Sequence, residues 1–170
     1  MKKILVILIM FIGTINISAQ ENNEAILQKI DSLQSQLNEL QIDYEFHKLE
    51  SELQRFNLDL KTFCNDVACA SNGILIACYH GYAEKELYES SKKRYDACVY
   101  LLDSYKENFN ATKEYLNLKI NKIKFSFLQS KLIDQSINAL NAAFNAAEHS
   151  LNHYKTTMSM YKDLIQLGRP

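Results

Sequence analysis

The residues with the widest range of possible chemistry in this sequence are four cysteines, namely Cys64, Cys69, Cys78 and Cys98. Thiols can form disulfides, bind a metal ion or pack as small apolar groups. Their spacing is C-x4-C-x8-C with a distant fourth member, whereas zinc sites typically use C-x2–4-C pairs. His80, two residues after Cys78, does not complete a common zinc pattern. We therefore interpret the four residues as disulfide candidates.

A helical hairpin would restrict which of these cysteines can pair. Cys64 and Cys69 are five residues apart, so on one helix their side chains would point about 140° apart. A chain reversal near residue 72 would bring Cys78 close to both. The nested pairing, Cys69–Cys78 with Cys64–Cys98, then requires the chain between the last two cysteines to fold back. One disulfide with two buried thiols, intermolecular disulfides and metal binding are the alternatives.

Two histidines form the other group that could do chemistry. His149 and His153 are four residues apart, so both rings would share one face of a helix, where they could bind a divalent metal. The metalloprotease motif H-E-x-x-H places its glutamate between the histidines, whereas Glu148 precedes this pair. The pair is therefore a two-ligand metal candidate, and the sequence implies no cofactor.

Motifs of enzymes and of nucleic-acid-binding proteins do not occur in the sequence. It has no glycine-rich phosphate loop, nucleophile elbow or paired acid–base motif. The chain has 19 basic and 20 acidic residues, and removing the two N-terminal lysines leaves 17 basic residues. Proteins that bind nucleic acids usually have a basic surface, which this balance does not favour. We expect a protein that is not an enzyme and does not bind nucleic acid.

The N-terminus has the layout of a secretory signal. Two lysines precede the apolar run Ile4–Ile12, and Ser18-Ala19 supply small residues at a cleavage site. The apolar run is shorter than the ~20 residues that span a bilayer. We predict that residues 1–19 are a signal peptide and that residues 20–170 form a single helical domain. This domain is expected in the periplasm or outside the cell, without an integral membrane span.

The elements that must position these residues are predicted to be helices. The chain has one proline and four glycines, and good helix formers dominate long stretches of it. A first apolar stripe advances by alternate steps of four and three, as on one side of a helix. Its members are Ile26, Ile30, Leu33, Leu37, Leu40 and Tyr44. A second stripe starts at Phe46 with its phase offset by two residues, so the helix must bend or change its packing partner there.

Turn and capping signals divide the chain into three helices. Ser71-Asn72-Gly73 is the clearest turn signal, because glycine accepts the left-handed backbone that ends many helices. Ser126 and Gln129 have the spacing of a capping box. A turn at 108–111, where two asparagines occur, would add a fourth helix. We predict an all-α fold, an elongated antiparallel bundle of three long helices resembling a coiled coil, with helices near 23–70, 74–126 and 130–167.

Charge is distributed unevenly along the chain. Residues 21–60 have a net charge of −6 and residues 111–170 have a net charge of +4. A hairpin folded about residue 72 would set Lys113–Lys124 against Glu21–Asp31. We therefore predict that the two oppositely charged stretches lie side by side.

Two further surfaces are candidates for binding a partner. The segment 74–82 is strongly apolar and would lie at or beside the tip of a hairpin. It either forms an exposed contact site or is folded inward by the cysteine cluster as a small local core. Its candidate residues are Ile74, Leu75, Ile76, Tyr79 and Tyr82. An asparagine stripe on the last helix lies among alanines, which would let another helix approach closely. Its members are Asn138, Asn141, Asn145 and Asn152.

Three functional hypotheses follow. The first is an exported, non-enzymatic helical protein that binds a protein partner or self-associates through one of these surfaces. The second is an inhibitor or immunity-type protein of the cell envelope that binds one toxin or enzyme. The third is a helical metal-binding protein that uses His149, His153 and His80.

Overall fold

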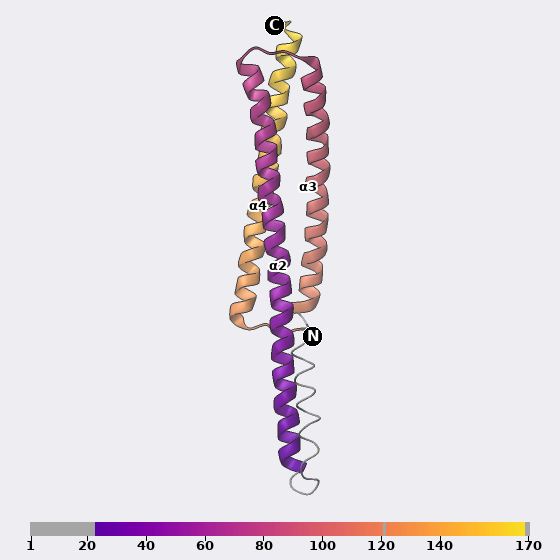
Figure 1. Ribbon diagram of the computed structural model, residues 1–170, viewed down its shortest axis with the longest axis vertical. Coiled ribbons are helices and arrows are strands. Elements are labelled where there is room, and N and C mark those ends of the chain that lie inside the picture. Colours follow the sequence, from indigo (N-terminus) through magenta and orange to yellow (C-terminus); the bar gives the residue numbers. More distant parts are fainter. Residues whose placement is uncertain (1–22, 121, 169–170) are drawn as a thin grey trace. The chain divides into compact units, whose positions relative to one another are not determined.

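The computed structural model describes residues 23–120 and 122–168 and contains three helices in this range (Figure 1). They are α2 (Asn23–Tyr79), α3 (Lys85–Ile120) and α4 (Phe127–Gln166). The chain divides into two compact units, Met1–Gln41 and Ile42–Pro170. The predicted signal peptide lies outside the described residues.

The prediction of an all-α bundle of three helices is confirmed. α3 continues through the Asn108–Ala111 region, where Thr112 Oγ1 donates a hydrogen bond to the carbonyl of Asn108, so there is no fourth helix at this point. Phe109 at the centre of that region is buried, which favours continuation of the helix over a turn.

Within residues 42–170, α3 runs antiparallel to α2 and α4 antiparallel to α3 (Figure 1). Aromatic pairs hold the helices together at successive levels. The rings of Phe63 on α2 and Tyr105 on α3 meet edge to face, with centroids 6.4 Å apart. Those of Phe109 on α3 and Phe144 on α4 are 5.2 Å apart. Aromatic contacts of this kind add stabilisation beyond the burial of apolar area.

The core of this unit consists of the apolar stripes that the helices turn toward one another. The second stripe of α2 is buried along most of its length, and its fully or nearly fully buried members are Phe46, Leu49, Leu53, Leu60, Phe63 and Val67. α3 and α4 contribute the following buried residues: Leu102, Phe109, Leu116, Ile133, Leu140, Phe144, Ala147, Leu151, Tyr154, Met158 and Tyr161.

The prediction that the first helix ends before Ser71–Gly73 is wrong. α2 continues to Tyr79, and the reversal falls at Gly81, whose φ of 71° lies in the left-handed region. Continuation buries Ile74, which is only 2% exposed, and burial of such a side chain is worth roughly 1.5–3 kcal/mol. A glycine inside a helix costs about 1 kcal/mol, so the burial outweighs the local preference for a turn.

Moving the reversal from residue 72 to Gly81 also changes the register of the hairpin. Lys119 on α3 pairs with Glu45, with Nζ and Oε1 3.1 Å apart. The register predicted from a reversal at residue 72 is therefore wrong. The acidic residues of α2 that face the end of α3 are those near Glu45.

The segment 74–82 is not a two-helix tip, because α4 reaches the same end of the bundle. The hydroxyl of Tyr161 on α4 accepts a hydrogen bond of 2.8 Å from the backbone N–H of Glu84 in the α2–α3 connection. Tyr154, at the next level along α4, donates its hydroxyl to the carbonyl of Ser91 at 3.0 Å. Both tyrosines are buried, so α4 closes the reversal instead of stopping short of it.

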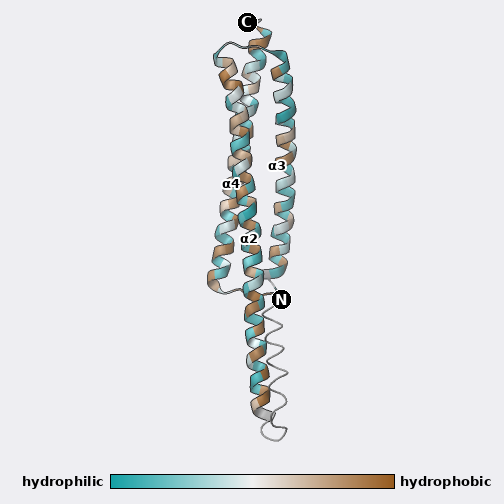
Figure 2. Ribbon diagram, in the orientation of Figure 1, coloured by the Kyte–Doolittle hydropathy of each residue, from teal (hydrophilic) through white to brown (hydrophobic). Residues whose placement is uncertain are grey.

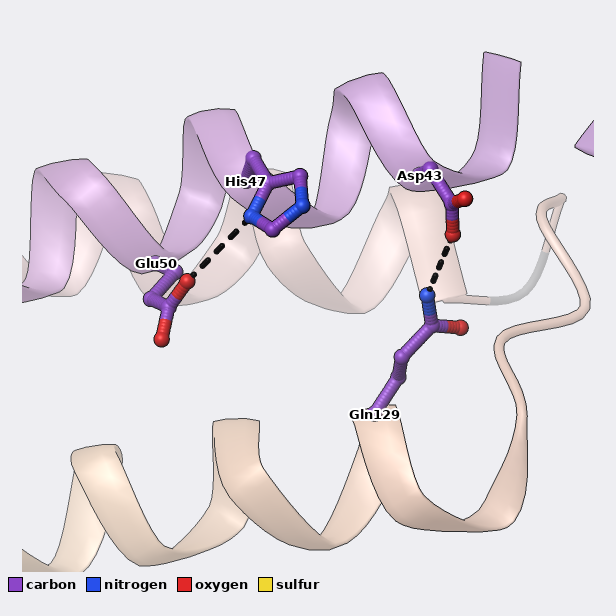
Figure 3. A network of polar contacts seen from close by, with 4 residues as sticks. All are labelled: Asp43, His47, Glu50 and Gln129. Atoms are coloured by element: carbon purple, nitrogen blue, oxygen red, sulfur yellow. Dashed lines mark hydrogen bonds and ion pairs between the residues drawn. The ribbon is translucent and has the colours of Figure 1, made fainter. Parts of the chain in front are cut away.

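The predicted capping box at the start of α4 is confirmed. Gln129 N–H donates to Ser126 Oγ at 3.2 Å, and Ser126 N–H donates to Gln129 Oε1 at 3.0 Å. Gln129 Nε2 also donates to Asp43 Oδ1 on α2 at 2.9 Å, near the contact between His47 and Glu50 (Figure 3). One glutamine therefore both begins α4 and fixes it beside α2.

Among the described residues, no helix combines the length and apolarity needed to cross a membrane.

The position of the reversal can be tested with two glycine substitutions. Gly73→Ala should stabilise the protein by about 0.5–1 kcal/mol, because alanine is the better helix former and a Cβ there would meet no atom within 4 Å. Gly81→Ala should destabilise it by about 1–2 kcal/mol, because φ is positive. Urea unfolding followed by circular dichroism measures both, and the opposite sign for each variant would refute the assignment.

Candidate protein-binding surface

The first apolar stripe of α2 is exposed along most of its length. We call it the α2 seam, and its members are Ile26, Ile30, Leu33, Leu37, Leu40 and Tyr44. Five of them are exposed and Leu33 is half-buried. Apolar residues recur along α2 from its first turns (Figure 2). The spacing of four and three residues places all six on one side of the helix.

A change in packing separates the α2 seam from the buried second stripe. Tyr44 is 67% exposed, whereas Phe46, two residues later, is 7% exposed and packs on Phe125, with ring centroids 6.5 Å apart. The phase offset of two residues between the stripes turns them to different sides of one helix. The sequence predicted either a bend or a change of partner here, and the structure shows that only the second stripe supplies core residues.

The predicted apolar tip is divided between core and surface. Ile74 is buried in the core, as is Ala77 one turn later. The other candidates, Leu75, Ile76, Tyr79 and Tyr82, are exposed. Leu75 and Tyr79 line a groove together with residues at the end of α4. These are Met160, Asp163 and Leu164, and Leu167 immediately after the helix. One of the predicted residues, Ile74, therefore belongs to the core. Two others, Leu75 and Tyr79, line a small apolar groove, and the segment does not form a continuous apolar tip.

The asparagine stripe lies on the outside of α4. All four of its members are exposed, namely Asn138, Asn141, Asn145 and Asn152. Asn141 Oδ1 accepts a hydrogen bond from Lys113 Nζ on α3 at 3.2 Å. Among the alanines near the stripe, Ala147 is fully buried in the core. The surface is therefore polar and offers amide groups, with little apolar area for a helix to bury.

The two histidines have different environments. His153 Nδ1 lies 2.9 Å from Ser71 Oγ, and Ser71 in turn lies 3.1 Å from Thr157 Oγ1. Ser71 and Thr157 are buried, so this cluster satisfies polar groups between α2 and α4. His149 lines a groove with His153, Ala68 and Asn72. In the part of the chain that the structure describes, no three histidine, cysteine or acidic residues are grouped so as to hold a metal ion.

The cysteines are all free thiols. The nested pairing fails first at Cys69–Cys78, because both residues lie on α2, nine residues and so about 13.5 Å apart along its axis. No pair lies at disulfide distance, so the four disulfide candidates stay unpaired within the chain. The error follows from the turn predicted at residue 72, which would have placed Cys78 on the next helix.

Three of the thiols pack beside the core and one does not. Cys64, Cys78 and Cys98 are half-buried against it, whereas Cys69 is exposed. Burial raises the pKa of Cys78. Burial also raises the pKa of Cys98, an effect that nearby Arg94 reduces and Asp66 increases. These thiols behave as small apolar groups, because a raised pKa disfavours the reactive thiolate.

Sequence reasoning missed a groove between α2 and α3. Charges alternate along its α2 side in the order Lys48, Glu52, Arg55 and Asp59. Phe56 and several α3 residues line the rest, namely Tyr105, Asn108, Ala111, Thr112 and Tyr115. Burial raises the pKa of Tyr105, and Asp59 adds to this rise. The alternate steps of four and three at positions 48, 52, 55 and 59 could have revealed a common face, but charged residues on a helix usually indicate a solvated surface.

The described residues therefore offer candidate binding surfaces of three kinds. The α2 seam is apolar and helical, the asparagine stripe is polar, and the α2–α3 groove has balanced charge. None of these places a nucleophile beside a base in the manner of a catalytic site. The α2 seam has the pattern with the most specific physical requirement, because heptad-spaced apolar residues pack best against another helix.

No family model, curated protein or solved structure matches the chain.

The thiol environments predict a defined order of alkylation. In the native protein, Cys69 should react with iodoacetamide at least about ten times faster than Cys78 or Cys98, because it is exposed and the pKa values of the other two are raised. After unfolding, all four thiols should react. Peptide mass spectrometry of timed samples measures both, and a residue that stays unreactive in unfolded, unreduced protein would reveal a disulfide.

Proposed function

We infer that this chain is an exported, non-enzymatic interaction protein that binds an amphipathic helix through the α2 seam. The observation that carries this proposal is the contrast between two adjacent stripes of one helix. The second stripe forms the bundle core, while the α2 seam, of similar apolar content, is exposed. Exposed apolar surfaces of this extent are typical of interaction sites.

The spacing of the α2 seam specifies the kind of partner. Alternate steps of four and three residues match the a and d positions of a coiled coil, into which the side chains of a second helix can insert. From Ile26 to Tyr44 the seam extends for about 27 Å. Each isoleucine or leucine that passes from exposed to buried can contribute up to roughly 1.5–3 kcal/mol before the cost of association.

The other two candidate surfaces support binding less well. The segment 74–82 contributes Ile74 to the core, so its remaining apolar area is discontinuous. The asparagine stripe is polar, and one of its members already accepts a bond from Lys113. A helix that docked on asparagines would exchange bonds with water for similar bonds with protein, which yields little net free energy.

Export is supported by the order of residues at the N-terminus. Basic residues, a short apolar run and small residues follow one another within residues 1–19, as in secretory signals. The proposed site of action is therefore the periplasm or the cell exterior. In that location the protein would meet its helical partner outside the cytoplasm.

Binding through the α2 seam can be tested with Leu37→Glu. Leu37 is 43% exposed and is not a core residue, so the variant should keep its helicity and unfolding midpoint. A buried carboxylate in the seam should weaken partner binding at least about ten-fold. The measurement is a tagged pull-down from the native envelope, read by mass spectrometry with the stoichiometry of each bound species, the protein itself included.

The matched control is Asn38→Glu, which adds the same charge at an exposed position outside the α2 seam. This variant should bind like the wild type. Equal loss of binding in both variants would show a general charge effect. Full binding by Leu37→Glu would refute the role of the seam.

Export has its own test. When the whole coding sequence is expressed in its host, the protein recovered outside the cytoplasm should have an intact mass that corresponds to a chain beginning near Gln20. Replacing the apolar residues Leu5 and Leu8 by Arg should leave the protein uncleaved in the cytoplasm, because a charged segment cannot act as the apolar part of a signal. Recovery of the wild type only in the cytoplasm, with Met1 retained, would refute export.

A further inference from the structure

We propose that the partner of the α2 seam is the same seam of a second copy of this chain, aligned antiparallel about Ser35. This inference rests on the proposed function, which requires only that some helix occupies the seam. It adds the identity, the direction and the register of that helix. Two properties of α2 carry it: the symmetry of the seam about its centre, and the charges that flank its ends.

The α2 seam is symmetric about Ser35, so that an antiparallel copy matches every layer. In this register each apolar residue faces one from the second chain. The layers are Ile26 with the partner's Tyr44, Ile30 with the partner's Leu40, and Leu33 with the partner's Leu37, each occurring twice. A shift by one heptad in either direction would leave seam residues of both chains without an apolar partner. Among antiparallel registers, the one about Ser35 is therefore the one that buries all six residues.

Charge complementarity selects the same alignment. Lys29 immediately precedes Ile30, and Asp43 immediately precedes Tyr44, so both occupy the flanking position that coiled coils use for interhelical ion pairs. In the antiparallel register Lys29 meets the partner's Asp43, and the symmetry creates this pair twice. Both side chains are exposed. The third residue at such a flanking position is Gln36, which immediately precedes Leu37. In this register it faces the partner's Gln36 at the centre of the contact.

A parallel alignment uses these charges differently. With two copies in parallel and in register, Lys29 would face the partner's Gln34, and Asp43 would face the partner's Lys48. Lys29 would then have no acidic partner. The antiparallel register is the one that pairs Lys29 with Asp43, the two charged residues that flank the seam.

The contact of Asp43 within its own chain is compatible with this pair. Asp43 Oδ1 accepts a hydrogen bond from Gln129 Nε2 at 2.9 Å (Figure 3). A carboxylate offers about four acceptor positions, so the same residue can also receive a lysine from a second chain. The bond to Gln129 restricts the carboxylate on α2, which lowers the conformational entropy lost when the ion pair forms.

The test is a measurement of self-association and of its dependence on the two charges. Sedimentation equilibrium of the protein as its host processes it, across roughly two decades of micromolar concentration, should reveal a monomer–dimer equilibrium. Lys29→Glu and Asp43→Lys should each raise the dimer Kd by about three- to thirty-fold, because each turns two attractive pairs into two repulsive ones. Leu37→Glu should leave only monomer.

Mixing the variants tests the register itself. An equimolar mixture of Lys29→Glu and Asp43→Lys should form a heterodimer about as stable as the wild-type dimer. In that heterodimer the two substituted side chains face each other with opposite charges, and the second pair keeps its native Lys29 and Asp43. Glu39→Lys is the matched control, since it makes the same charge change as Asp43→Lys at an exposed position outside the flanking sites. Mixing Lys29→Glu with Glu39→Lys should give no such recovery.

Two results would overturn the proposal. The first is a protein that stays monomeric over the whole range, and the second is a dimer in which mixing with Asp43→Lys and mixing with Glu39→Lys have the same effect. Neither result by itself removes the proposed function. If a monomeric wild type still captures another protein that Leu37→Glu does not, the seam binds a different helix. If it captures none, both proposals fail.

Discussion

The continuation of α2 through Ser71–Gly73 is the constraint on which the rest of the bundle depends. Because the helix does not end there, Ile74 and Ala77 are buried in the core and the chain reverses at Gly81. The position of a reversal fixes the register of every residue pair between two antiparallel helices. The pairing of Lys119 with Glu45 and the edge-to-face contact of Phe63 with Tyr105 both follow from it. Tyr161 then secures the reversal from α4 by its bond with the backbone of Glu84.

Much of this fold could be predicted from the spacing of apolar residues alone. The number of helices, the phase change near Tyr44 and the capping box at Ser126 all follow from patterns that span a few turns. The position of the first reversal could not be predicted in this way. Ser71-Asn72-Gly73 has a local preference for a turn, and only the burial of Ile74 against other helices outweighs it. Tertiary packing of this kind is not visible in a local window.

That single error explains the outcome at the predicted cysteine site. A reversal at residue 72 would have placed Cys69 and Cys78 on facing helices, whereas the structure places them on the same one. The missed α2–α3 groove has a different cause. Its lining residues are mostly charged along α2, and such residues usually indicate a solvated face, so their common position becomes informative only when α3 is placed beside them.

The two stripes of α2 allow folding and association to be independent. Residues of the second stripe are buried in the bundle, so a substitution there changes the free energy of unfolding. Residues of the α2 seam are largely exposed, so a substitution there leaves the core intact and acts on whatever the seam binds. The offset of two residues between the stripes turns them to different sides of one continuous helix. Folding through the second stripe and association through the α2 seam therefore depend on different residues of α2.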